Sequence, residues 1–352
     1  MRLIDRVLFI FSRVSWLVLI VGLGGLFCIS WMLMHYFEPV SPISQPATYW
    51  WYFLVTIATV GYGDLSPATL GGRIVGAGVI FFGIGLFAAL LTKVAERLIE
   101  FSQRRRKGMV GLNVSGHIVL MGYRPGKTEE VVRELRADPK TCDRHIVLCS
   151  ATAPENPFAV DHIDFVKGEL TSNTVLENAC VGRAVMVLIH GSDDHHTLAT
   201  GIAVSSVAGE TAHIVAYFRT RGNGELLTKV NRHVDVVRSL TVPMLVLSLQ
   251  DPGSSTVFQR LASDLDADAS QYRLNIPDGV GPVSFLDLFM AFKRRHNATV
   301  TALASDWSTH ADLDINPRCD AKVRGGMSLF YIADHRLVDA EIDWEKLTVL
   351  VC

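Results

Sequence analysis

The residues with the clearest chemistry stand next to one another in Thr59-Val60-Gly61-Tyr62-Gly63. A cation sheds its hydration water only where protein oxygen atoms replace that water, and a row of inward-pointing backbone carbonyls can do so. Such a row needs a backbone that alternates between conformations that L-residues avoid, and Gly61 and Gly63 allow it because they have no Cβ. The Thr59 hydroxyl adds one more oxygen, and the Tyr62 ring is expected to point away from the ions. The segment therefore predicts a binding site for dehydrated cations.

The flanking segment must hold this irregular backbone, which is tolerated at membrane depth only where it lines a water-filled path or is buried in protein. Residues 47–56, which follow Pro46, have the composition of a short helix. The partially negative C-terminal end of that helix would face the ion path. The apolar stretch 49–60 is about a dozen residues long, which suits a re-entrant segment better than a complete membrane crossing.

Apolar residues make up 49% of the chain, and they are concentrated near its N-terminus. Between residues 14 and 92 the only acidic or basic side chains are Glu38, Asp64 and Arg73. The apolar runs 14–37 and 74–91 are each close to the roughly 20 residues that a helix needs to cross the hydrocarbon core. We therefore expect two membrane-spanning helices, with Glu38 and Asp64 at the outer side.

The distribution of basic residues predicts the orientation in the membrane. Two crossings put both chain ends on one side, and flanking positive charge marks that side as cytoplasmic. The flanking basic residues are Arg2, Arg6, Arg13, Lys93, Arg97, Arg104, Arg105, Arg106 and Lys107. We expect a multi-pass protein of the cell membrane, embedded in the lipid bilayer, with cytoplasmic N- and C-termini. A cleaved signal peptide is disfavoured because the first run is too long for its apolar region.

The stretch TIATVGYGD, residues 56–64, resembles the potassium-channel signature. The resemblance implies a potassium-selective ion channel. The residues that it implies as K+ ligands in the selectivity filter are Thr59, Val60, Gly61, Tyr62 and Gly63. It also implies that Trp51 supports the filter by donating to the Asp64 carboxylate, whereas membrane-interface anchoring is the alternative role for this tryptophan. Because the chain has one such loop and no internal repeat, we expect a homotetramer.

The second apolar run is rich in glycine, which weakens a helix by about 1 kcal/mol per residue relative to alanine. Its glycines include Gly76, Gly78, Gly83 and Gly85. Phe82-Gly83-Ile84-Gly85 resembles the gating hinge of two-helix channels, which implies that Gly83 or Gly85 bends. Close helix packing through small residues is the alternative interpretation.

After Lys107 the chain has the mixed charge of a soluble protein, and strand and helix patterns alternate. The predicted strands are residues 117–121, 145–149, 163–166, 184–189 and 213–218, with helices at 128–137, 174–179 and 194–207. This alternation is typical of a doubly wound parallel sheet, a Rossmann-like α/β fold. Together with the filter, residues 116–240 resemble the RCK family, whose domains regulate potassium conductance. FVKGELT at 165–171, LENA at 176–179 and AVMV at 184–187 carry this resemblance.

The predicted organisation is an α-helical membrane domain followed by cytosolic lobes. The boundaries are 1–107 for the transmembrane pore domain, 108–115 for a linker, 116–240 for the RCK N-lobe, 241–268 for crossover helices through which such domains pair, and 269–352 for a small α+β C-lobe. Residues 325–332 resemble the last core strand of the C-lobe, with Gly326 where an aspartate is usual. Such pores normally carry twice as many RCK domains as four chains supply. An internal start at Met109 would provide the additional soluble RCK subunits.

The turn after the first predicted strand decides whether a dinucleotide fits. Rossmann sheets hold the pyrophosphate at a G-x-G-x-x-G turn and the ribose with an acidic residue at the end of the second strand. Here Arg124 replaces the middle glycine, and the second strand ends at Ser150. We therefore do not expect an NAD-linked enzyme, and the sequence shows no nucleophile, base and oxyanion set for any other enzyme. A nucleotide regulator bound in a different pose stays open by analogy of fold.

A polar cluster follows the fourth predicted strand, at the sheet edge where such folds bind ligands. It consists of His190, Asp193, Asp194, His195 and His196. These side chains could hold a regulatory ligand or a divalent metal such as zinc. The alternative is that an aspartate caps the next helix and that the histidines are solvated.

Calcium is not expected at the position that calcium-gated RCK relatives use. The matching residues, Leu188, Tyr217 and Arg219, offer none of the carboxylate oxygens that calcium requires. With a net charge of -2 and no basic aromatic stripe, the chain also gives no sign of binding nucleic acid. Two functions stay open: a potassium channel gated by its RCK domains, and a constitutively open pore for which the RCK domain is only an assembly scaffold.

Overall fold

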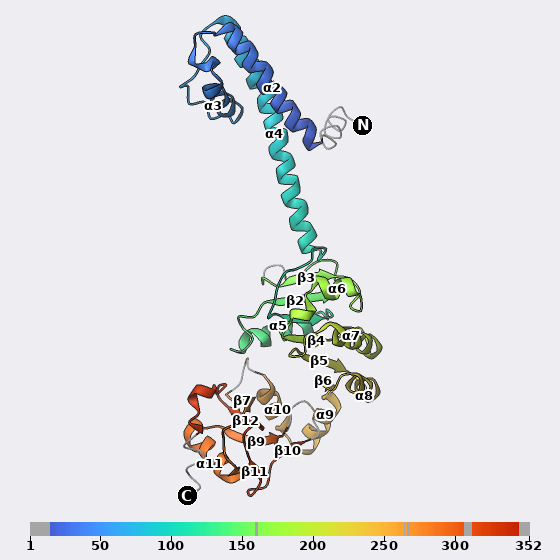
Figure 1. Cartoon of the computed structure of the whole chain (residues 1–352). Coiled ribbons are helices and arrows are strands. Elements are labelled where there is room, and N and C mark those ends of the chain that lie inside the picture. Colours follow the sequence, from blue (N-terminus) through green and yellow to red (C-terminus); the bar gives the residue numbers. More distant parts are fainter. Residues whose placement is uncertain (1–14, 159–160, 264, 266–267, 306–311, 345–352) are drawn as a thin grey trace. The chain divides into compact units, whose positions relative to one another are not determined.

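The computed structural model describes residues 15–158, 161–263, 265, 268–305 and 312–344 (Figure 1). The chain forms two compact units, Met1–Arg104 and Arg105–Cys352. Arg2, Arg6 and Arg13, on which the predicted orientation partly depends, lie outside the described residues, as do the final residues of the predicted C-lobe.

The first unit contains two helices that are long and apolar enough to cross a membrane, as predicted. They are α2 (Trp16–Phe37) and α4 (Leu70–Arg106), with mean hydropathies of 2.4 and 2.5 over their most apolar windows. Helix α2 begins after Ser15, whose hydroxyl accepts a hydrogen bond from the Leu17 amide. Helix α4 extends beyond the predicted run 74–91 in both directions. Hydropathy does not detect this extension, because the last turns of α4 are rich in charged side chains.

A re-entrant segment lies between these helices, and its short helix α3 (Pro46–Ile57) matches the predicted one. Pro46 stands at the first turn, where its missing N–H costs no hydrogen bond. Tyr49, Phe53 and Ile57 of α3 are buried against Met34 of α2 and Val79 of α4. A 3-10 turn, η1 (Pro42–Ser44), connects α2 to α3, and the Trp31 indole donates to the Ser44 carbonyl at 3.1 Å.

The second unit begins with a six-stranded parallel sheet in the order β3-β2-β1-β4-β5-β6. The strands are β1 (Ile118–Met121), β2 (Ile146–Ser150), β3 (Asp164–Lys167), β4 (Met186–Ile189), β5 (His213–Phe218) and β6 (Val234–Arg238). The helices between them are α5 (Lys127–Ala137), α6 (Asn173–Asn178), α7 (Asp194–Val207) and α8 (Arg221–Val230). The predicted Rossmann-like fold is thereby confirmed, with its strand order reversing between β1 and β4.

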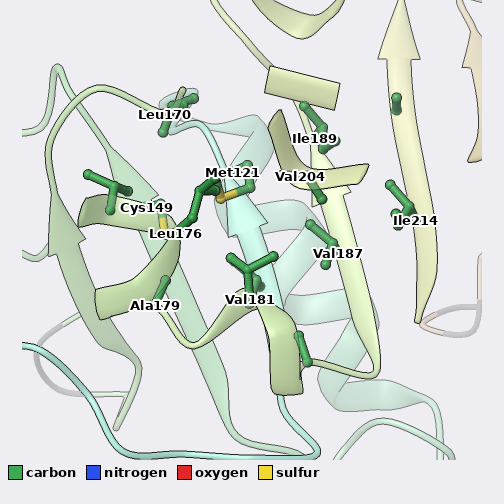
Figure 2. Packing of buried hydrophobic residues seen from close by; sticks show 14 of the residues in the cluster. Met121, Cys149, Leu170, Leu176, Ala179, Val181, Val187, Ile189, Val204 and Ile214 are labelled. Carbon is green, nitrogen blue, oxygen red and sulfur yellow. The ribbon is translucent and has the colours of Figure 1, made fainter. Parts of the chain in front are cut away.

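Both faces of this sheet are covered, because successive side chains of each strand point to opposite faces. Val119, Met121 and Cys149 pack with α6 and α7, in the core shown in Figure 2. Ile118 and Leu148 belong to the other core, with Val132 of α5. The strands therefore lack polar alternation, as is usual for doubly covered parallel sheets.

Two amphipathic helices follow, α9 (Thr241–Gln250) and α10 (Ser254–Ala262), and neither contains a buried residue among those described. They occupy the segment for which crossover helices are predicted. Large apolar side chains on them, such as Leu245, Leu249 and Val257, are exposed in the single chain.

The last part of the second unit is built on a four-stranded antiparallel sheet in the order β10-β9-β12-β7. Its strands are β7 (Ser270–Asn275), β9 (Thr299–Ala304), β10 (Leu313–Ile315) and β12 (Ser328–Ala333). Helix α11 (Phe285–His296) packs on this sheet, and β8 (Val283–Ser284) pairs with β11 (Lys322–Val323). The second unit also contains two short 3-10 turns. The turn η2 (Val181–Arg183) precedes β4, and η3 (Asp339–Glu341) follows β12.

The predicted last core strand, residues 325–332, needs a correction at its start. Strand β12 begins at Ser328, and Gly325 and Gly326 belong to the preceding turn. Gly326 has a φ of 80°, and the Gly325 amide donates to the Val280 carbonyl. A Cβ on Gly325 would collide with the Asp278 backbone, so the glycines serve a close turn rather than a strand.

Candidate functional site

The loop after α3 has the alternating backbone that its sequence predicts. Thr59, Gly61 and Gly63 have φ angles of 59°, 58° and 77°, and the residues between them do not have positive φ. Positive φ is accessible to glycine but costs energy at a β-branched residue such as Thr59. Successive peptide groups that alternate in this way can present their carbonyl oxygens along one line, which is what cation coordination by backbone requires.

The C-terminal end of α3 fixes the start of this loop. The amides of Val60 and Gly61 both donate to the Val55 carbonyl, at 3.0 and 3.2 Å, and the Thr59 amide donates to the Thr56 carbonyl. These bonds use carbonyl groups that a helix end leaves without partners. The loop is therefore attached to a helix whose side chains Tyr52, Phe53 and Ile57 are buried, and it inherits the position of that helix.

The C-terminal end of the loop is held by the predicted pair of side chains. Trp51 Nε1 donates to Asp64 Oδ2 at 3.0 Å. The Trp51 ring also stacks on the Tyr62 ring, with centroids 5.7 Å apart and an interplanar angle of 9°. The indole thus contacts the loop at two points, through a hydrogen bond to a carboxylate and through an aromatic face.

A further carboxylate, Glu38, links the C-terminal end of α2 to the residues just before α4. The Thr69 amide donates to Glu38 Oε1 at 2.5 Å, and Thr69 Oγ1 donates to the Phe37 carbonyl at 3.3 Å. Glu38 is buried, and the absence of a side chain at Gly72 leaves room for its carboxylate. The sequence offered one signal for this role, a lone acidic residue at the end of an apolar run.

The two candidate hinge glycines of α4 have different surroundings. A Cβ on Gly83 would lie 2.5 Å from Ile57 Cγ2, so Gly83 lets α4 approach α3 closely. Nothing lies within 4 Å of a Cβ built on Gly85. Both residues stand inside one continuous helix. The packing interpretation therefore accounts for Gly83 but not for Gly85.

Comparison with known proteins shows which family the segment around this loop resembles. Residues 16–100 match the family model described as ion channel. The calcium-gated potassium channel TvoK of Thermoplasma volcanium is 28% identical over 161 residues, which are 45% of this chain and 44% of that protein. Potassium channel protein 1 of Methanocaldococcus jannaschii is 28% identical over 156 residues, 42% of this chain and 45% of that protein.

The match to the ion channel family model covers residues 16–100 and does not extend to the rest of the chain. The relatives are potassium channels, in agreement with the resemblance of residues 56–64 to the potassium-channel signature. The chain spans less than half of the length of these curated relatives. Among solved structures, the GsuK channel bound to NAD is 16% identical with a TM-score of 0.44, covering 99% of this chain and 60% of that one.

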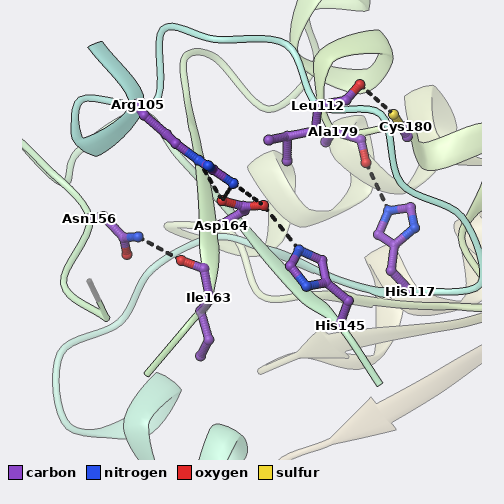
Figure 3. A network of polar contacts seen from close by, with 9 residues as sticks. All are labelled: Arg105, Leu112, His117, His145, Asn156, Ile163, Asp164, Ala179 and Cys180. Carbon is purple, nitrogen blue, oxygen red and sulfur yellow. Dashed lines mark hydrogen bonds and ion pairs between the residues drawn. The ribbon is translucent and has the colours of Figure 1, made fainter. Parts of the chain in front are cut away.

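The last turn of the channel helix α4 is attached to the parallel sheet, as Figure 3 shows. Arg105 Nη2 lies 3.2 Å from Asp164 Oδ1, and His145 Nε2 lies 3.0 Å from Asp164 Oδ2. Asp164, which is largely buried, begins β3, and His145 directly precedes β2. A backbone hydrogen bond also attaches the end of α4, since the Asn156 amide donates to the Arg106 carbonyl at 2.9 Å. The sequence does not reveal this contact, because Arg105 and Asp164 are 59 residues apart along the chain.

The side chains of the predicted polar cluster after β4 do not converge on one site, because they contact different partners. Asp193 caps α7 by accepting from the His196 amide at 2.9 Å, which is the capping alternative. Asp194 accepts from the amides of Arg219 and Thr220, at 2.9 and 2.8 Å. His196 Nε2 lies 2.9 Å from Glu169 Oε1.

These contacts, together with the surroundings of the other histidines, decide the chemistry of the cluster. His195 is exposed, whereas the half-buried His190 ring packs on Tyr217 with centroids 4.7 Å apart. Burial lowers the pKa of His190, and the nearby cations of Arg124, Lys127 and Arg219 lower it further. Across the described part of the chain, no three His, Cys, Asp or Glu side chains are arranged to hold a metal ion. In this arrangement Asp193 and Asp194 accept helix and loop amides, and a regulatory ligand or metal at the cluster stays a prediction.

The turns at the switch point between β1 and β4 lack the features with which such folds hold the pyrophosphate of a dinucleotide. Arg124 Nη2 donates to the carbonyls of Gly191 and Ser192, at 2.7 Å for Gly191, and so bridges the loops that follow β1 and β4. Gly122 has a φ of 111°, and a Cβ there would collide with the His190 carbonyl. At the end of β2, the Ser150 hydroxyl accepts from the Ala153 amide at 3.1 Å and presents no carboxylate for a ribose.

Proposed function

We propose that this chain is one subunit of a homotetrameric potassium-selective channel. The observation that carries the proposal is the alternating backbone of residues 59–63, with positive φ at Thr59, Gly61 and Gly63. Four such loops around one axis would surround K+ with carbonyl oxygens in place of water. The substrate is therefore K+, and the residues that bind it are Thr59, Val60, Gly61, Tyr62 and Gly63.

The chain's own residues would lower the cost of ion entry in two ways. The C-terminal end of α3 carries a partial negative charge and leads directly into the loop, so it favours a cation at the start of the loop. Trp51 and Asp64 brace the outer end, so that the loop does not collapse when an ion leaves. The glycine-rich middle of α4 would then form the lower part of the pathway.

The experiment that tests selectivity is a reversal-potential measurement on the purified full chain in planar bilayers. Under a potassium to sodium gradient, the reversal potential should lie near the potassium equilibrium potential. A value near zero would show that the loop does not discriminate between the two ions.

We further propose that the cytosolic RCK-like unit gates the pore rather than serving only as a scaffold. The ion pair between Arg105 and Asp164 supports this, because it joins the end of α4 to the first residue of β3. Arg105→Gln and Asp164→Asn should each change the open probability while leaving the tetramer intact. Arg97→Gln, which alters an exposed pair with Glu100 within α4, is the matched control. If both test variants behave like this control, the constitutively open pore with an RCK scaffold is the better description.

The regulatory ligand of the unit is left open, although the crevice between β1 and β4 restricts it. A nucleotide would have to displace Arg124 from the Gly191 and Ser192 carbonyls, or bind in another pose. Placement in the plasma membrane with cytoplasmic termini follows from the charge distribution and is part of the same proposal. Accessibility of an introduced cysteine near each end to a membrane-impermeant reagent tests it.

Soluble RCK subunits that begin at Met109 would complete a ring with twice as many domains as four full chains supply. Met109 is exposed in the linker, and a chain that began there would keep the hydrogen bonds made by the linker residues after it. Among these, the Leu112 amide donates to the Asn178 carbonyl, and the Gly116 amide donates to the Arg183 carbonyl. Mass spectrometry of the purified complex should show this shorter chain, and Met109→Ile should remove it.

A further inference from the structure

Asp164, the first residue of β3, is contacted by two basic side chains from different parts of the chain (Figure 3). Arg105 of α4 lies 3.2 Å from Asp164 Oδ1 through its Nη2 and 3.3 Å through its Nε. The Nε2 of His145, which precedes β2, lies 3.0 Å from Asp164 Oδ2. The Arg105 Nη2 is also 3.5 Å from Oδ2, so the two basic groups share that oxygen. One carboxylate therefore binds an arginine, which is always charged, and a histidine, whose charge depends on pH.

The geometry defines where His145 would take up a proton. A carboxylate only accepts hydrogen bonds, so His145 Nε2 carries a hydrogen and donates it to Asp164 whether the ring is neutral or charged. The additional proton comes from water and binds at Nδ1, and 39% of the side chain is exposed to water. Only 14% of the Asp164 side chain is exposed, so water and salt screen its contacts incompletely. A change of charge on His145 therefore acts on Arg105 through the shared carboxylate.

The other charged or titratable side chains of the neighbouring segments already have partners or stay neutral. They are Arg144, which donates to a backbone carbonyl at 2.9 Å, Glu155, which lies 3.3 Å from the Arg106 guanidinium, and the fully buried His117, whose pKa is lowered by burial. A proton on His145 therefore adds net positive charge beside the pair of Arg105 and Asp164.

This added charge competes directly with Arg105. While His145 is neutral, the charges of Arg105 and Asp164 cancel, but once it is protonated two cations share one carboxylate. Like charges a few Å apart repel each other, and the repulsion is larger where water is partly excluded. Exposed ion pairs stabilise a structure only slightly, and 59% of the Arg105 side chain is exposed. A moderate repulsion is therefore enough to release Arg105.

We propose that His145 is a pH-sensitive switch for the attachment of α4 to the parallel sheet. When it is protonated, His145 takes over the Asp164 carboxylate and Arg105 is released, and when it loses the proton, Arg105 binds again. The effect of this switch on the pore rests on the gating role proposed above for the pair of Arg105 and Asp164. Because the proposed tetramer has four such attachments, small losses at each of them add up in the open probability.

The first test measures the open probability of the full-length channel in planar bilayers at pH 8 and pH 6 on the cytosolic side. Acidification should change it by about fivefold or more, the effect of one unit charge a few Å away. The change should have the same direction as that caused by Arg105→Gln at pH 8, because both loosen the same contact. His145→Gln keeps a donor for Asp164 but cannot be protonated, so its response to acid should be lost. His233→Gln, at an exposed position, is the matched control and should retain the response.

A spin label on α4 gives a second readout that does not depend on gating. Ser102→Cys places the label at an exposed position about one turn before Arg105. The native cysteines that would compete for the label are replaced by serine, at Cys28, Cys142, Cys319 and Cys352. The label should be more mobile at pH 6 than at pH 8, and His145→Gln should abolish this difference.

The two readouts separate a failure of the switch from a failure of the proposed gating. If Arg105→Gln leaves the open probability at pH 8 unchanged, the gating proposal fails, and the label alone decides whether the switch exists. The switch is overturned if label mobility is the same at both pH values, or if it responds to acid in His145→Gln as it does in His233→Gln.

Discussion

Trp51 and Asp64 show how single residues set the geometry of the loop. The indole is held by α3, whereas the carboxylate follows the loop directly, so their 3.0 Å hydrogen bond connects a rigid element to an irregular one. Charge-assisted hydrogen bonds are roughly twice as strong as neutral ones. The contact therefore limits how far the outer end of the loop can move.

Trp51→Phe keeps an aromatic ring beside Tyr62 but removes the donor to Asp64. We expect the loop to leave its conducting conformation more readily, so that bursts of openings shorten by about tenfold, which corresponds to ~1.4 kcal/mol. Single-channel recording measures burst length directly. Trp50→Phe is the matched control, because Trp50 neighbours Trp51 but is half-exposed. Equal burst lengths in the two variants would show that the hydrogen bond does not stabilise the loop.

The residues of this site differ in how far sequence alone could predict them. Gly61 and Gly63 were predictable because the required backbone is local and only glycine adopts it without strain. Glu38 and Arg124 were not, because each acts on a backbone group far along the chain. The partner of Glu38 is 31 residues away, and the Gly191 partner of Arg124 is 67 residues away. A pattern read along the chain cannot place such partners before the fold is known.

Among the elements, α4 carries two glycines for which the structure suggests different roles. Gly83 packs against Ile57, and Gly85 faces open space in the single chain. A glycine that weakens a helix without serving local packing is the better candidate for a bend. We therefore assign packing to Gly83 and propose bending at Gly85.

Gly85→Ala should stiffen α4 by about 1 kcal/mol and lower the open probability, with little change in tetramer stability. Gly83→Ala should instead lower the melting temperature of the tetramer, because the new methyl group meets Ile57. In the double variant Gly83→Ala with Ile57→Leu, the β-methyl group is absent, and part of the stability should return. A loss of tetramer stability in Gly85→Ala as large as that in Gly83→Ala would contradict this assignment.

The sequence predicted the strands that are continuous apolar runs, and it missed β6. Residues 234–238 read VDVVR, and the charged Asp235 and Arg238 conceal a strand that is half-exposed at the sheet edge. For the antiparallel sheet, the sequence analysis predicted only the last strand, because the strands pair between segments that are distant in sequence. Strand pairing of this kind depends on which faces must be buried together, which local propensity does not specify.

The start of β1 contains a titratable group that makes stability depend on pH. His117 is completely buried, and its Nε2 lies 2.9 Å from the Ala179 carbonyl (Figure 3). Burial lowers the pKa of His117, although the hydrogen bond to Ala179 opposes the effect in part. The unfolded chain protonates this histidine near its ordinary pKa of about 6.5, whereas the folded state stays neutral to lower pH. Acidification therefore favours the unfolded state.

The free energy of unfolding of the cytosolic unit should be constant above about pH 7.5 and should fall as pH decreases below about 6.5, where the unfolded state takes up protons. The slope approaches about 1.4 kcal/mol per pH unit for each histidine that stays neutral. Guanidinium titrations of the full chain at several pH values measure it. His117→Gln keeps a donor for Ala179 but cannot be protonated, so the slope should decrease. His233→Gln, at an exposed position, should retain it, and an equal slope in both variants would contradict the prediction.

At the scale of the whole molecule, the connection between the two units was only partly predictable. Hydropathy and charge separated a membrane part from a mixed-charge part, and the structure divides the chain at Arg104. The continuation of α4 to Arg106, and its attachment through Arg105 to Asp164, depend on contacts between segments far apart in sequence. Under the proposed gating, an input to the second unit would act on α4 through the Arg105–Asp164 pair.

The relative TvoK is described as calcium-gated, so the effect of calcium on this chain is informative. The residues predicted to match the calcium position are Leu188 on β4, Tyr217 on β5 and Arg219 just beyond β5, and none has a carboxylate. Calcium takes several hard oxygen ligands. The carboxylates in the loop after β4, Asp193 and Asp194, already accept backbone amides at the start of α7 and from the loop after β5.

We therefore expect that millimolar cytosolic calcium leaves the open probability of the full-length channel unchanged in excised patches. The positive charge of Arg219 adds to this expectation, because like charges a few Å apart repel by several kcal/mol at intermediate dielectric. Asp193→Asn with Asp194→Asn separates the two ways in which the expectation can fail. A calcium-induced rise that this double variant abolishes would place the ion in the loop after β4. A steep activation that is lost instead on mutation of Tyr217 or Arg219 would show that the usual position binds calcium without a carboxylate of its own.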